Sequence, residues 1–222
     1  MSLALALGAR EIPDWTEAEE RLVHEAPVSL PLFAQDLSDA IRRGDDPLGD
    51  AFSRGFSAEE RRPKGATYTP QPIIDAMLDW AESQVRPVRV VDPGAGSARF
   101  LVSAGRRFPR AELVASEVDP LAAILARGHL AAAGMGKRSH VVVGDYRQLD
   151  LPVIDGPTLY LGNPPYVRHH LIEPAWKTWF VKTARGIGHD ASQLAGLHVH
   201  FFLATAAHAR AGDVGVLITA AE

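Results

Sequence analysis

The stretch "VRVVDPGAGSARF", residues 88–100, carries the strongest indication of the fold. Its first residues form a short β-rich apolar run, and the glycines that follow favour a tight turn into a helix at about 98–107. Such a turn lets the backbone approach a ligand closely, and a helix N-terminus attracts an anionic group. The segment therefore predicts a strand, a turn and a helix. Nucleotide-binding folds use this combination, but it also occurs as a tight turn that binds no ligand.

The pattern repeats along the rest of the chain. Four more β-rich runs follow, at 112–117, 140–145, 158–163 and 214–219. Helices are expected between the strands and before the first one, at about 71–84, 120–133 and 195–211. Short continuous apolar strands separated by helices are typical of a parallel sheet covered on both faces. We therefore expect an α/β fold with a mostly parallel sheet.

Residues 1–60 differ from the rest in composition. Apolar residues recur at helical spacing over 14–43, whereas Gly and Pro over 44–66 favour a linker. Residues 1–50 hold 4 Lys/Arg and 11 Asp/Glu, while the remainder holds 19 and 16. We predict a helical N-terminal extension with a linker over 1–60, packed against a main domain over 61–222.

Composition narrows the class of protein. The 222 residues include 46% hydrophobic side chains, enough for a sizeable core. They contain no apolar run of the roughly 18 residues that a membrane-spanning helix needs. Zero cysteines exclude disulfides and thiolate metal sites. We expect a cytoplasmic protein without a membrane partner and without a bound metal.

The residues directly after the strands are the candidates for ligand binding, since ligands of open parallel sheets bind beyond the carboxyl ends of the strands. Glu117 ends the second strand, 21 residues after Gly96, where a carboxylate can accept both hydroxyls of a ribose. A helix N-terminal acid is the alternative role for it. Asp145 follows the third strand and could accept a hydrogen bond from an adenine amino group, with Tyr146 flanking the ring.

The fourth strand ends in Asn163-Pro164-Pro165-Tyr166. Proline lacks an N–H and restricts φ, so this peptide is stiff and cannot extend the sheet. A turn that closes a buried strand would explain Asn-Pro alone. A glycine turn, two acids and Asn-Pro-Pro-Tyr at four successive strand ends together indicate a ligand-binding site.

With these motifs the sequence resembles the S-adenosylmethionine-dependent methyltransferases of the Rossmann-like type, and specifically the adenine-N6 DNA methyltransferases of restriction–modification systems. It is most similar to their gamma group, in which the methionine-binding segment precedes the glycine motif. Here that segment is "KGATYTPQPIIDAM", residues 64–77, and the resemblance covers roughly residues 64–221. It implies transfer of a methyl group from S-adenosylmethionine to the N6 amino group of adenine in DNA.

The resemblance also implies roles for individual residues along the cofactor. Those that would border its methionine end or shape its binding turn are Tyr68, Thr69, Pro70, Asp92, Gly94, Gly96 and Phe100. Those that would bind its adenosine end are Glu117 at the ribose and Val118, Asp145 and Tyr146 at the adenine. Ala98 departs from the family pattern, because it replaces a glycine and would add a methyl group where the backbone approaches the cofactor.

Asn163, Pro164, Pro165 and Tyr166 would form the catalytic motif. An exocyclic adenine amine is a poor nucleophile because its lone pair is delocalised into the ring. The side-chain oxygen of Asn163 and the carbonyl of Pro164 could accept both N6 hydrogens, and proline rigidity would hold these acceptors in place. Tyr166 could stack on a base flipped out of the duplex.

Other interpretations stay open. Release-factor glutamine methyltransferases and some ribosomal-RNA adenine methyltransferases also use Asn-Pro-Pro-Tyr, and a non-catalytic cofactor-binding module of a larger complex would keep the same fold. The family sheet has seven strands and we count five, so we expect a fragment that lacks the last two strands and has low or no activity alone. DNA is the expected partner, together with a specificity or nuclease subunit or domain. Residues 167–189 hold four Lys/Arg and one acidic residue, a segment that could meet phosphates.

Overall fold

The computed structural model describes residues 1–25, 34–55 and 69–219. Its centre is a five-stranded sheet in which each strand runs parallel to its neighbours. The strands are β1 (Arg89–Pro93), β2 (Glu112–Glu117), β3 (Ser139–Val143), β4 (Thr158–Gly162) and β5 (Val214–Leu217). Their order is β3-β2-β1-β4-β5, so the chain builds one side of the sheet first and then crosses to the other. The switch point, where such sheets bind ligands, lies between the carboxyl ends of β1 and β4.

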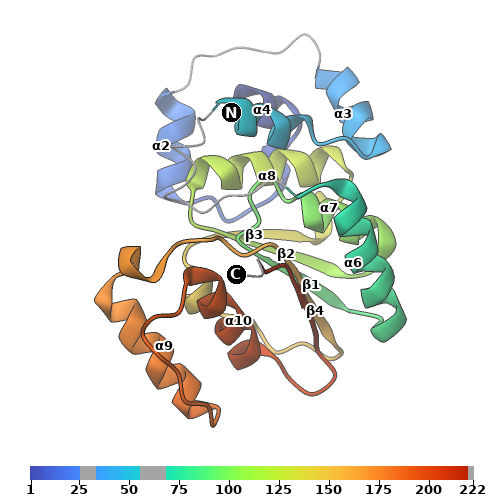
Figure 1. Ribbon diagram of the computed structural model, residues 1–222. Coiled ribbons are helices and arrows are strands. Elements are labelled where there is room, and N and C mark those ends of the chain that lie inside the picture. The colour runs from blue at the N-terminus through green and yellow to red at the C-terminus, as the bar shows by residue number, and fades with distance from the viewer. Residues whose placement is uncertain (26–33, 56–68, 220–222) are drawn as a thin grey trace.

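Helices cover both faces of this sheet (Figure 1). One face carries α6 (Gln71–Gln84), α7 (Arg99–Arg107) and α8 (Pro120–Ala132). The other carries α10 (Leu197–His208), with α9 (Pro174–Gly186) beside it. The described residues also include four short 3₁₀ turns: η1 (Ala9–Glu11), η3 (Gly136–Arg138), η4 (Tyr146–Gln148) and η5 (His169–Leu171).

Successive side chains along the strands contribute alternately to the two cores, one on each face of the sheet. Val90 packs under α6 to α8, whereas its neighbour Val91 packs on the α10 side, and Leu113 and Val114 of β2 divide in the same way. Successive strand residues point to opposite faces, so a strand covered on both faces needs apolar residues at every position. This explains the continuous apolar runs in the sequence. The five predicted strands and the four predicted helices between 71 and 211 are confirmed within a few residues.

The N-terminal region packs on α8. Its helices are α1 (Ser2–Ala6), α2 (Glu17–Glu25), α3 (Ala34–Arg43) and α4 (Pro47–Gly55), and each contacts α8. The prediction of a linker over 44–66 is wrong for 47–55, which form α4. The physical reason is burial: Leu48 is 1% exposed and packs in one cluster with Ile41 and Ile124.

A buried ion pair fastens this region to the main domain. Arg127, in the middle of apolar α8, donates from Nε to Oε1 of Glu19 over 2.7 Å, and both side chains are 0% exposed. Its other nitrogens donate to carbonyls of residues 12–14 and to Val141 on β3. None of the described helices combines the length and the apolar character needed to cross a membrane.

Candidate active site

The glycine turn after β1 lies directly beside Asn-Pro-Pro-Tyr. Gly94, Gly96 and Ala98 have φ values of +76°, +53° and +63°, a left-handed conformation that glycine adopts most readily. A Cβ added to Gly94 would lie 3.4 Å from Cδ of Pro165, whereas one added to Gly96 would meet no atom within 4 Å. The turn is therefore closed toward the proline motif at Gly94 and open at Gly96.

Asn163 connects the proline motif to the segment that precedes α6. Its Nδ2 donates to Oγ1 of Thr69 over 3.1 Å. Its Oδ1 is buried and accepts no hydrogen bond from any residue that the structure describes. Thr69 is 5% exposed and Pro70 is exposed at the N-terminus of α6. Tyr68 lies outside the described residues. The predicted Thr-Pro and Asn-Pro-Pro-Tyr segments thus meet, and they leave one acceptor atom available.

The end of the proline motif faces α10. Pro164 is buried and Tyr166 is half-buried. The ring of Tyr166 lies 5.5 Å from the ring of His198 between centroids, with the planes 33° apart. The N–H of Leu197 donates to the carbonyl of Val167 over 2.9 Å, which ties the start of α10 to this loop. His198 and Tyr166 together present aromatic surface beside Asn163.

Glu117, at the end of β2, is held by the glycine turn. Its Oε2 accepts from the N–H of Gly96 over 2.8 Å and its Oε1 from the N–H of Asp119 over 2.9 Å. Burial raises the pKa of Glu117, and these amide hydrogen bonds oppose the rise. The next residue, Val118, is 61% exposed. Glu117 therefore lies next to the open part of the turn, and exposed Val118 follows it directly in the chain.

Asp92 is a buried carboxyl group at the end of β1. It is 1% exposed, and within the described parts of the chain neither of its carboxyl oxygens has a hydrogen-bond partner. It lies close against β4, since a Cβ added to Gly162 would be 2.5 Å from Oδ1. Burial raises the pKa of Asp92 well above its ordinary value, and the negative charge of Glu117 raises it further. Such a group fits a ligand that brings a hydrogen-bond donor.

The raised pKa of Asp92 predicts a pH-dependent stability. Between the ordinary pKa of about 4 and the raised native value, the native state binds a proton that the unfolded state releases. The contribution of Asp92 to stability is therefore full at acidic pH and is lost as pH rises. We expect Asp92→Asn, which has no carboxyl group to ionise, to gain stability relative to the unchanged protein from pH 4 to 8. Urea unfolding across this range measures it, and parallel curves for the two proteins would contradict it.

Asp145, after β3, forms an ion pair with Arg147. Arg147 donates from Nε to Oδ1 of Asp145 over 2.8 Å and pairs with Oδ2 as well. The guanidinium carbon lies 3.6 Å from the ring centroid of Trp176 on α9. A carboxylate oxygen has two lone pairs, so Asp145 keeps the capacity to accept another hydrogen bond. Sequence reasoning did not find Arg147, although an arginine two residues from an acid in a turn is a usable signal.

Comparison with known proteins identifies the family. A model of the N-6 DNA methylases matches residues 43–179, more than half of the chain. The chain belongs to the N-6 DNA methylase family. Over its whole length it is 45% identical to the type II methyltransferase M.XamI of Xanthomonas campestris pv. amaranthicola, of which it spans 42%.

One further relative and one solved structure give the extent of the similarity. The chain is 33% identical over 95 residues to a release factor glutamine methyltransferase of Bordetella pertussis, an alignment that spans 43% of this chain and 34% of that protein. In three dimensions it resembles the type I restriction-modification system methyltransferase subunit from Streptococcus thermophilus, with a TM-score of 0.55 at 20% identity over 78% of this chain and 39% of that one. The predicted Rossmann-like methyltransferase fold is thereby confirmed.

Two predicted cofactor residues of this N-6 DNA methylase are core residues. Tyr146 is 1% exposed, and its hydroxyl lies 2.9 Å from Oγ1 of Thr205 with its ring 5.3 Å from Phe201. The turn η4 directs it under α10, so its ring is not available to flank an adenine. Phe100 is 6% exposed and packs between the sheet and α6 to α8. We leave both side chains out of the cofactor site proposed below.

Ala98 differs from the expectation as well. Its side chain is 0% exposed and packs in the same core as Phe100. The expectation that its methyl group faces the cofactor is wrong, because the left-handed conformation at the helix start turns Cβ toward the core.

We therefore expect Ala98→Gly to leave the affinity for S-adenosylmethionine unchanged within about twofold. Relief of the left-handed conformation gains about 1–2 kcal/mol. The greater backbone freedom of unfolded glycine and the loss of a buried methyl group together oppose this by about 1–2 kcal/mol. Because these contributions nearly cancel, the free energy of unfolding should change little. Calorimetric titration measures the affinity, and urea unfolding measures the free energy of unfolding. A tenfold gain in affinity would show that the methyl group does obstruct the cofactor.

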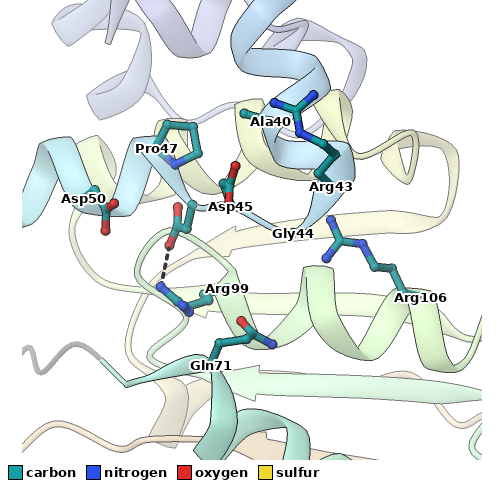
Figure 2. Close-up of a pocket in the computed structure, with 10 residues that line it drawn as sticks. Ala40, Arg43, Gly44, Asp45, Pro47, Asp50, Gln71, Arg99 and Arg106 are labelled. Carbon is teal, nitrogen blue, oxygen red and sulfur yellow. Dashed lines mark ion pairs between the residues drawn. The ribbon is translucent and has the colours of Figure 1, made fainter.

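A cleft of about 680 Å³ opens beside α7, next to the segments that carry Pro70 and Phe100 (Figure 2). It lies between α7, the start of α6 and the loop that joins α3 to α4. Its lining residues are Ala40, Arg43, Gly44, Asp45, Asp46, Pro47, Asp50, Gln71, Arg99 and Arg106. None of the predicted site residues lines it. One lining residue, Asp46 of the N-terminal extension, contacts Ser97 in the glycine turn.

Proposed function

We propose that the protein is an S-adenosylmethionine-dependent methyltransferase that modifies the N6 amino group of adenine in DNA, within a restriction–modification system. One observation carries the proposal: Oδ1 of Asn163 is a buried acceptor without a partner among the described residues, in an Asn-Pro-Pro-Tyr motif beside the glycine turn. The family membership and the 45% identity to M.XamI support the same activity.

The residues at the ends of β1 and β2 fit S-adenosylmethionine, which supplies an electrophilic methyl group on a sulfonium. The open space at Gly96 allows a ligand to approach the backbone. Glu117, oriented by the amide of Gly96, offers a carboxylate for the ribose hydroxyls, and exposed Val118 offers apolar surface for the adenine. Asp92 supplies a buried carboxyl group that has no partner of its own in the described chain.

Asn163 and Pro164 would activate the target amine. Thr69 occupies the amide nitrogen of Asn163, which leaves Oδ1 for one N6 hydrogen, while the carbonyl of Pro164 accepts the other. Two acceptors favour a pyramidal nitrogen with its lone pair directed away from the ring. The proline peptide holds them with little reorganisation. Tyr166, beside His198, provides the aromatic surface on which a flipped adenine would stack.

The helix α9 supports DNA as the substrate. It carries Lys177, Lys182 and Arg185 and lies at the outside of the molecule beyond α10 (Figure 1). Basic side chains on one helix can contact phosphates without reading sequence. A specificity or nuclease subunit as partner, a cytoplasmic location and the division of the chain at residue 60 belong to the same proposal.

Cofactor binding is the first test. We expect calorimetric titration to show binding of S-adenosylmethionine, weakened at least about tenfold in Glu117→Gln because a hydrogen bond to a charged acceptor is lost. Glu112→Gln, at the opposite end of the same strand, is the matched control and should bind as the unchanged protein does. A folded protein that binds no S-adenosylmethionine would refute the cofactor site.

The substrate is tested with labelled S-adenosylmethionine under single-turnover conditions, so that slow transfer is still measured. Duplex DNA and a glutamine-containing release-factor peptide are offered in parallel. We expect N6-methyladenine in the DNA, identified by mass spectrometry. Methylation of the glutamine alone would favour the release-factor activity, and binding without any transfer would favour a non-catalytic module.

A further inference from the structure

Asp46 of the N-terminal extension reaches the glycine turn. Its carboxylate is 2% exposed. Oδ2 accepts a hydrogen bond from Oγ of Ser97 over 2.8 Å, and Oδ1 accepts from the N–H of Gly49 over 2.7 Å. Arg99, the first residue of α7, points toward the same carboxylate, and the dashed line in Figure 2 marks this ion pair, whose atoms are 4.0 Å apart. A single carboxylate thus connects the start of α4 to the turn.

Ser97 is held from a second side. His129 on α8 donates from Nδ1 to the carbonyl of Ser97 over 2.8 Å, and the same nitrogen lies 3.5 Å from Oδ1 of Asp46. Burial lowers the pKa of His129, and the negative charge of Asp46 opposes this shift. The N–H of the preceding residue, Gly96, is in turn bound by Glu117. The turn is therefore fixed at its backbone by α8 and β2 and at its only hydroxyl by the N-terminal extension.

This attachment explains how a strained turn persists. Ala98, next to Ser97, keeps a left-handed φ of +63° without being a glycine. A conformation of this kind lasts only where the surrounding contacts over-determine it. Asp46 and His129 supply such contacts on both sides of Ser97, immediately before the strained residue.

We propose that Asp46 is a positioning residue for the cofactor, which acts through Ser97 to hold the glycine turn in its binding conformation. The N-terminal extension then completes the cofactor site instead of only covering α8. This inference rests on the proposed function, since it concerns the same turn. The competing role is helix capping alone: Asp46 precedes α4, and its Oδ1 binds the N–H of Gly49 as an N-cap does.

One substitution separates these roles. Serine is a good N-cap but is too short to keep a bond to Ser97 as well, so Asp46→Ser preserves the cap and removes the attachment. Ser97→Ala removes the attachment from the other side. Asp45→Ser, at the exposed neighbouring acid, is the matched control for a change of charge in the same loop.

The experiment is calorimetric titration of the full chain with S-adenosylmethionine, with thermal unfolding of each variant. We expect Asp46→Ser and Ser97→Ala each to weaken binding about tenfold. The double variant should be no weaker than the weaker single variant, because both single variants remove the same Asp46–Ser97 hydrogen bond. Asp45→Ser should bind as the unchanged protein does.

The outcomes separate this proposal from the proposed function. Binding at full affinity by Asp46→Ser or by Ser97→Ala overturns the positioning role, even where thermal stability falls. Losses that multiply in the double variant, or an equal loss in Asp45→Ser, overturn it too. If the unchanged protein binds no S-adenosylmethionine, the proposed cofactor site is refuted and the positioning role with it. If the unchanged protein binds S-adenosylmethionine and only the Asp46 and Ser97 variants bind it more weakly, the result supports both the cofactor site and the positioning role.

Discussion

Replacement of Asn163 by alanine is expected to slow methyl transfer to adenine at least about 100-fold, while S-adenosylmethionine binds with nearly unchanged affinity. The loss of one preorganised hydrogen-bonding group at a reacting centre costs about 2.7–4 kcal/mol of transition-state stabilisation. Oδ1 of Asn163 is the buried acceptor placed for this role, and Asn163 contacts the Thr69 side chain instead of the glycine turn. Single-turnover transfer of labelled methyl groups to duplex DNA, together with calorimetric titration, measures both quantities.

Two variants make this result specific. Asn163→Asp keeps an acceptor oxygen at the same place, so its rate should lie between those of the alanine variant and the unchanged protein. Thr69→Val removes the hydroxyl that occupies the amide nitrogen, and we expect a smaller loss because the acceptor remains but is less well oriented. A rate for Asn163→Ala within about threefold of the unchanged protein would contradict the assigned role.

Arg127→Ala is expected to lower the free energy of unfolding by about 3–5 kcal/mol, because it leaves the Glu19 carboxylate buried without its partner. Both side chains are 0% exposed, and several carbonyls lose their donor at the same time. For a chain of this length the melting temperature should fall by roughly 10 °C. Urea unfolding and thermal unfolding measure the two effects.

A surface pair serves as the control for Arg127. Arg42 and Asp39 on α3 are 3.4 Å apart, and both side chains are about half exposed. Removal of such a pair changes stability by less than about 1 kcal/mol. The double variant Glu19→Ala/Arg127→Ala should recover part of the loss, since no charge is then left unpaired in the core. A loss in Arg127→Ala as small as in Arg42→Ala would show that the buried pair is not a main attachment of the N-terminal region.

Polar residues inside the apolar α8 could have indicated these attachments earlier. Arg127 and His129 interrupt an otherwise apolar helix, and charged residues are rarely buried unless they are paired. The sequence therefore indicates that partners exist. It does not say which ones, because Glu19 is 108 residues from Arg127 and Ser97 is 32 residues from His129. Pairing over such distances depends on how the N-terminal helices cover α8.

The sequence by itself determined the order of strands and helices and the positions of the candidate site motifs. Both follow from interactions between near neighbours: apolar periodicity selects the element, and glycine or proline ends it. Parallel strands then bring the residues that follow them to one edge of the sheet, which is why the Gly94 turn meets Pro165.

Only the tertiary structure decided where individual side chains point and what completes the site. Tyr146 follows β3 and Ala98 lies in the glycine turn after β1, as the sequence predicts. Packing nevertheless buries Tyr146 against α10 and Ala98 in the core formed with α6 to α8. Arg147 engages Asp145, and Asp46 reaches the glycine turn from the N-terminal extension. The direction of a side chain at a strand end depends on the free energy of burying it against whatever element covers that face, and that element is encoded elsewhere in the chain.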